Sequence, residues 1–148
     1  MKRINVLCLS ATALVLLPTA VVAQQKSLKE QIQGPWSVVS CNNTDAKGEK
    51  FAYCSNPKGI LILAGNGHYS VTAIASGRKD LNAPGIVTNF GTWSVNEADK
   101  TLTRHVVGSS DPANEGRDYT VNISLNGEEM RLTGNFRGHI DSTYRRFK

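Results

Sequence analysis

The sequence predicts an all-β protein: an eight-stranded antiparallel up-and-down β-barrel with a short N-terminal helix. Three observations support this fold class. One helical signal precedes eight runs of strand-forming residues, tight turns and longer loops alternate between the runs, and the clearest run alternates apolar with polar residues. The same eight runs would also fit a flattened β-sandwich with a filled core, because strand number alone does not separate the two architectures.

The first 23 residues predict a cleaved secretory signal. Lys2 and Arg3 are followed by a long apolar run, and Val21 and Ala23 supply the small side chains that signal peptidase requires before its cut. A membrane anchor is the alternative, but a helix-breaking proline and the cleavage pattern favour the signal. We therefore expect a periplasmic or secreted protein.

Residues 24–148 are of a length that suits one domain with one core. Without the signal the net charge falls from +5 to +3, and the basic residues are spread evenly, so no nucleic-acid partner is predicted. No second apolar segment is long enough to span a membrane, so no stable insertion is expected after cleavage.

Cys41 and Cys54 are the two cysteines that follow the signal, and we expect one disulfide between them. The loop that it closes is short, so the gain in stability is ~3 kcal/mol at most. A redox pair or a metal site is the alternative. The sequence has neither a CxxC motif nor a histidine or cysteine at ligand spacing nearby, so no metal is predicted.

A helix is expected to begin at Ser27. Ser27 and Glu30 form the capping-box pattern, and Leu28 and Ile32 lie on one face before a Gly-Pro pair ends the helix. Strands are then expected at residues 36–42, 59–64, 68–75, 89–95, 101–107, 118–125, 129–134 and 139–147.

The connections indicate which end of the barrel is open. In a meander, every second connection falls at the same end, so the tight turns should close one end beside the helix and the longer loops should surround a mouth that carries the disulfide. The tight turns are residues 65–67, 96–99 and 126–127, and the longer connections are residues 43–58, 76–88, 108–117 and 135–138.

The strand at residues 118–125 gives the clearest prediction of sidedness. Its apolar residues should line the interior together with two from the following strand, and its polar residues should be exposed. The expected interior residues are Tyr119, Val121, Ile123, Leu125, Met130 and Leu132, and the expected exposed ones are Thr120, Asn122 and Ser124.

A Gly34-Pro35-Trp36 sequence behind a short helix resembles the G-x-W signature of lipocalins. The wider pattern, which includes Asn66-Gly67-His68-Tyr69 and Phe90-Gly91-Thr92-Trp93, is similar to the bacterial lipocalin-like domain family, a relative of the lipocalins and fatty-acid-binding proteins. This resemblance implies an eight-stranded barrel that binds a small apolar molecule. It also implies that Trp36 packs at the barrel base under Arg145 or Arg146, and we assign Arg145 to this structural role.

The interior of the barrel should hold the ligand. Arg104 and His105 are adjacent in one strand, so one must point inward, and the family pattern, which has a histidine at this position, favours His105. The predicted ligand-binding residues are His105, Tyr69, Tyr119, Val121 and Ile123.

Binding of a small hydrophobic or amphipathic molecule in the barrel is the leading functional hypothesis, with no cofactor. A protease inhibitor, with residues 24–34 as an inserting arm and a protein partner, is an alternative; a docked helix there would argue against it. A cofactor-free isomerase or cyclase is a further alternative. The sequence has no nucleophile elbow, phosphate loop, HExxH motif or paired catalytic carboxylates, so no catalytic residues are predicted.

Overall fold

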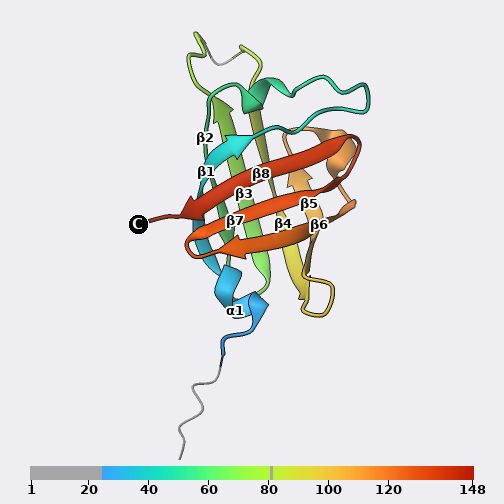
Figure 1. Cartoon of the computed structure of the whole chain (residues 1–148). Coiled ribbons are helices and arrows are strands. Elements are labelled where there is room, and N and C mark those ends of the chain that lie inside the picture. Colours follow the sequence, from blue (N-terminus) through green and yellow to red (C-terminus); the bar gives the residue numbers. More distant parts are fainter. Residues whose placement is uncertain (1–24, 81) are drawn as a thin grey trace, which may run out of the picture.

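The protein forms a closed antiparallel β-barrel in a computed structural model, which describes residues 25–80 and 82–148. Neighbouring strands follow the chain order, and β8 pairs with β1, so the sheet closes on itself (Figure 1). The predicted up-and-down barrel is confirmed. The elements are α1 (Leu28–Ile32), β1 (Gly34–Cys41), β2 (Pro57–Leu63), β3 (His68–Ala75), β4 (Ile86–Asn96), β5 (Thr101–Ser109), β6 (Asp118–Asn126), β7 (Glu129–Asn135) and β8 (His139–Arg146), with short 3₁₀ turns at Ala52–Cys54 and Pro112–Asn114.

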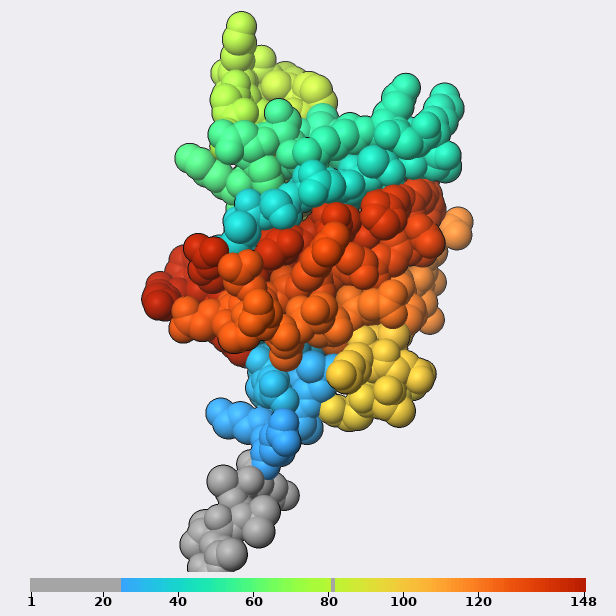
Figure 2. Space-filling view, viewed as in Figure 1, coloured from blue at the N-terminus to red at the C-terminus, as the bar shows by residue number. Residues whose placement is uncertain are grey.

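The two ends of the barrel differ as predicted. Residues 64–67, 97–100 and 127–128 make the short connections at the end that carries α1, which we call the base. The opposite end, the mouth, carries longer loops at residues 42–56, 76–85 and 110–117 (Figure 2). The β7–β8 connection at the mouth has only residues 136–138 and is shorter than expected. The predicted signal at residues 1–23 lies outside the described residues.

β4 begins three residues earlier than the sequence prediction. Ile86, Val87 and Thr88 are β-branched and pair with residues 72–74 of β3, so they extend the wall toward the mouth. The Pro84-Gly85 pair, which precedes them, is where the loop ends. The 76–88 loop is therefore three residues shorter, and the barrel wall is taller on this side.

α1 closes the base. Ser27 and Glu30 make the predicted capping box, and the Glu97 carboxylate accepts hydrogen bonds from the backbone N–H groups of Leu28 and Lys29 at 2.8 and 2.9 Å. Ile32 is completely buried in the barrel core. Within residues 25–80 and 82–148, no helix is long and apolar enough to cross a bilayer.

Side chains fill the base half of the barrel. Trp36 is 1% exposed, and its indole N–H donates to the Ile32 carbonyl at 2.7 Å. The other fully buried aliphatic residues of this core include Leu61, Leu63, Leu102 and Met130. The prediction for β6 and β7 is confirmed: Tyr119, Val121, Ile123, Met130 and Leu132 are buried, Leu125 is partly buried, and Thr120, Asn122 and Ser124 are exposed.

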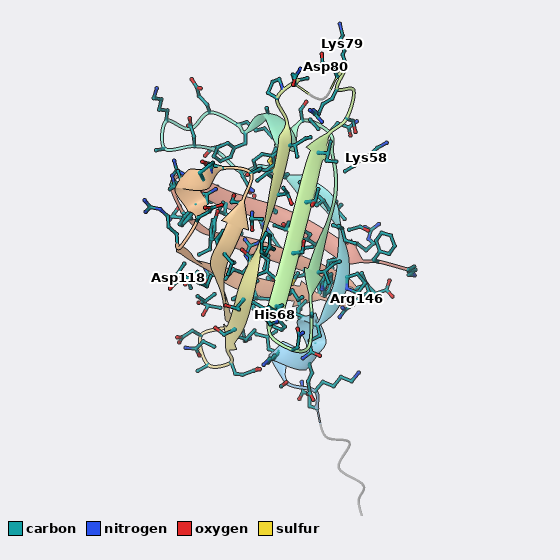
Figure 3. The ribbon with its side chains drawn as sticks, turned by 180° about the vertical axis from the view of Figure 1, so that it is seen from behind. Lys58, His68, Lys79, Asp80, Asp118 and Arg146 are labelled. Atoms are coloured by element: carbon teal, nitrogen blue, oxygen red, sulfur yellow. A yellow bond between two sulfur atoms is a disulfide. The ribbon has the colours of Figure 1, made fainter. Side chains whose placement is uncertain are left out.

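The arginine over Trp36 is Arg146, and the assignment of Arg145 is wrong. The Arg146 guanidinium lies 3.9 Å from the Trp36 ring centroid and donates to the backbone carbonyls of Gln31 and Gln33 (Figure 3). Arg145 is exposed and pairs with Glu129 at 3.0 Å. Tyr144 is buried in the same strand, so the alternation of β8 turns Arg145 outward and Arg146 back toward the base.

Candidate functional site

The half of the barrel above the base core is hollow. A cavity of about 340 Å³ lies between the strands and the mouth loops. Its wall combines aliphatic side chains such as Val38, Val71 and Leu132 with the aromatic rings of Tyr119 and Tyr144. This combination of apolar walls and sparse polar groups is typical of sites for small organic molecules.

Arg104, not His105, points into the barrel. Arg104 is only 8% exposed, lines the cavity and pairs in register with Trp93 and Tyr119, which are also buried. The prediction that His105 lies inside is therefore wrong. Leu102 and Val106, which share the side of Arg104, are completely buried, and burial of these two apolar neighbours selects this face of β5 for the interior.

His105 lies on the outer surface with an acidic partner. Its side chain is 49% exposed, and Nδ1 lies 2.8 Å from an oxygen of the Asp118 carboxylate, itself 66% exposed. Figure 3 shows Asp118 on the outside of the wall, away from the interior. Because both groups remain solvated, this pair contributes little to stability and nothing to the cavity lining.

The Arg104 guanidinium lies between two tyrosine rings. It is 5.3 Å from the ring centroid of Tyr69 and 5.3 Å from that of Tyr119. Cation–π contacts of this kind favour a buried cation, although they leave its N–H donors unused. Arg104 Nε is buried and has no hydrogen-bond partner, and the guanidinium makes no ion pair with any residue in 25–80 or 82–148.

The tyrosines beside Arg104 are neutral phenols at physiological pH. Burial raises the pKa of Tyr69 to about 12, although the positive charge of Arg104 acts in the opposite direction. Burial also raises the pKa of Tyr119 and of Tyr144. None of these hydroxyls therefore supplies the negative charge that would neutralise Arg104.

Hydrogen bonds hold the polar groups around the cavity in place. The Tyr69 hydroxyl donates to Asn89 Oδ1 at 2.9 Å, which leaves the amide N–H₂ group of this buried asparagine without a hydrogen bond to a described residue. On the opposite wall, Asn43 Oδ1 accepts from the Ser142 hydroxyl at 2.9 Å, and its amide donates to the Tyr53 hydroxyl at 3.3 Å. These bonds connect the mouth loop at residues 42–56 to β8.

The mouth is built from loops that contact one another. The predicted Cys41–Cys54 disulfide is present and ties the end of β1 to the following loop. Across the mouth, Arg137 donates to Asp111 at 3.1 Å and to Asn114 at 2.9 Å, so the β7–β8 turn is fastened to the β5–β6 loop. These contacts give the rim of the cavity a defined shape.

Apart from His105 on the outer surface, the predicted ligand-binding residues occupy three different places. Tyr119 lines the cavity, and its ring contacts Phe136 of the β7–β8 turn. Tyr69 lies against Arg104, whereas Val121 and Ile123 belong to the buried core and not to the cavity wall. Sequence analysis weighed Arg104 against His105 for the inward position and favoured His105. The pattern that favours Arg104 is the composition of its strand face. Arg104 shares its face with two aliphatic residues, whereas His105 shares the other face with a threonine and a valine.

No protein-family model matches this chain, and no curated protein matches it either. The resemblance to lipocalin-like domains therefore stays a prediction.

Proposed function

We propose that this protein binds a small, mostly apolar molecule in the mouth half of the barrel. The observation that carries the proposal is the cavity of about 340 Å³, which lies above a base that is filled by Trp36 and its neighbours. Burial of apolar ligand surface against walls of this kind provides the binding free energy. The Cys41–Cys54 disulfide is consistent with an oxidising compartment, and together with the predicted signal it supports export to the periplasm or beyond.

The shape of the base argues for binding from the mouth. α1 and the short turns cover one end, and the mouth loops surround the other (Figures 1 and 2). The ligand would therefore enter between the loops near Arg137 and leave by the same route. The inhibitor alternative requires a free, extended arm at residues 24–34, but residues 28–32 form a helix and Ile32 is buried in the core.

A cavity-filling substitution tests this function. Ala73 of β3 lines the cavity, and the Ala73→Phe variant should abolish binding of a neutral fluorescent probe, 2-naphthalenemethanol, because the new ring occupies the same space. Ile74, the next residue, is exposed, so Ile74→Phe adds a ring of the same kind outside the barrel and serves as the control. Equal probe affinity in Ala73→Phe and wild-type protein would contradict the proposal.

A further inference from the structure

The structure holds a buried cation for which the described chain supplies no anion. Arg104 carries five N–H donors and a full positive charge, yet its guanidinium makes cation–π contacts with Tyr69 and Tyr119 and no hydrogen bond or ion pair with a described residue. Removing a charge from water is costly unless a partner of opposite charge or a set of hydrogen bonds replaces the water. The neutral phenols do not meet this requirement.

From this arrangement we infer that the natural ligand is a compact organic monoanion of the carboxylate class, bound with its acid group against Arg104. The inference rests on the proposed function and specifies its ligand. A carboxylate fits because a guanidinium presents its donors as a planar fork that matches two carboxylate oxygens. Tyr69 and Tyr119 hold that fork between their rings, so its donors are oriented before the ligand arrives.

The orientation of the ligand follows from the depth of Arg104. Leu102 also points inward and lies two residues closer to the base than Arg104. It belongs to the filled core, whereas Arg104 lines the cavity. Arg104 therefore lies near the floor, and an acid group that contacts it leaves the apolar part of the ligand among Val71, Tyr119 and Leu132. The ligand thus enters with its acid group first.

The remaining charges of the cavity limit the ligand to one negative charge. Arg137 lies at the rim, but it already pairs with Asp111. Asp45 also lines the rim, has no ion pair with a described residue, and would repel a second acid group at the outer end of the ligand. The size of the cavity limits the ligand further, because about 340 Å³ lies at the lower end of the range for small-molecule sites, roughly 300–1,000 Å³.

A pair of matched probes tests the inference on the folded, disulfide-bonded protein. 2-Naphthoate and 2-naphthalenemethanol share the same ring system and differ in the carboxylate, and calorimetric or fluorescence titration at pH 7.5 gives a Kd for each. Wild-type protein should bind the naphthoate more tightly, by a factor on the order of 10 to 100, because charge-assisted hydrogen bonds replace the lost water.

Variants of two adjacent residues then assign the preference to Arg104. In Arg104→Met, the preference should disappear, so that the Kd for naphthoate is no lower than the Kd for the alcohol. His105→Met changes the next residue on the outer face and should keep the wild-type preference. If Arg104→Met does not fold, Arg104→Lys replaces it, because lysine keeps the charge but lacks the planar fork. The ratio of the two Kd values should then be smaller than in wild-type protein but still favour naphthoate.

The possible failures are distinguishable. Equal affinity of wild-type protein for the two probes would overturn the inference and leave cavity binding in place, as would a full preference for naphthoate in Arg104→Met. If wild-type protein binds neither probe, both the proposed function and this inference are overturned.

Discussion

Two arginines of this barrel lie against aromatic rings, and their surroundings differ in one respect. Arg146 covers Trp36 at the base and donates to the carbonyls of Gln31 and Gln33, so its charge-bearing group is used within the fold. Arg104 lies between Tyr69 and Tyr119 and donates to no group in the described part of the chain. The comparison separates an arginine that completes the structure from one that is available to a ligand.

The two halves of the barrel differ in the same way. The base is packed to exclude water, with Ile32 and Trp36 at its centre, whereas the mouth half encloses a cavity. The filled base stabilises the fold. This stability allows the mouth half to contain a cavity and the buried charge of Arg104.

The largest expected effect is on the base. Trp36→Ala removes a large side chain that is almost fully buried together with its hydrogen bond to Ile32, and we expect a loss of about 3–5 kcal/mol in the free energy of unfolding. Urea titration measures it. Val71→Ala, which enlarges an existing cavity, should cost clearly less, and equal costs would mean that the two halves are packed alike.

Removal of the disulfide should have the next largest effect. Replacing Cys41 and Cys54 by serine frees a loop that spans 13 positions of the sequence, and the chain-entropy model gives a loss of about 3 kcal/mol. The loss should be accompanied by weaker binding of 2-naphthalenemethanol, because the loop that joins these residues forms part of the mouth. Unchanged unfolding and unchanged binding in the double variant would show that the mouth does not depend on the bridge.

The two arginines should respond in opposite ways to the same substitution. Arg146→Met leaves two backbone carbonyls without a donor and should cost about 1–3 kcal/mol. Arg104→Met replaces a buried charge that pairs with no described residue by an apolar side chain of similar length, so stability should stay the same or increase. The melting temperatures of both variants test this prediction. Strong destabilisation of Arg104→Met would mean that the role of Arg104 is structural.

The smallest expected effect concerns pH. Burial raises the pKa of Tyr69 to about 12, whereas the phenol titrates near 10 when the chain is unfolded. Above pH 10 the unfolded state therefore releases this proton while the folded state retains it, so stability should fall between pH 10 and 12. Tyr69→Phe should lose less stability across this interval than wild-type protein, as measured by the melting temperature. Identical pH profiles of the melting temperature in Tyr69→Phe and wild-type protein would contradict the attribution of this loss to Tyr69.

Much of the architecture could be predicted from local patterns. The capping box at Ser27 and Glu30 needs only neighbouring residues, and the alternation in β6 fixes which side chains are buried once one face meets a core. β4 was predicted too short because Ile86 and Val87 follow a Pro-Gly pair, and their pairing with β3 is a long-range interaction.

The site was harder to predict, because it depends on sidedness that a polar residue alone does not reveal. Arg104 and His105 are both polar and adjacent, and a charged residue is rarely expected inside a barrel. Burial of Leu102 and Val106, which lie on the same side of β5 as Arg104, contributes more free energy than burial of the one charge costs. This balance decides which face of β5 points inward. The cavity also depends on closure of the sheet and on the mouth loops, which no single strand pattern encodes.

The most direct test of the account is an NMR titration that observes both arginines at once. The Nε–H resonances of Arg104 and Arg146 can be assigned by substitution and followed while 2-naphthoate is added to wild-type protein. The account predicts that the Arg104 resonance shifts until the site is saturated and that the Arg146 resonance stays in place. An Arg104 resonance that does not move while naphthoate binds would contradict it.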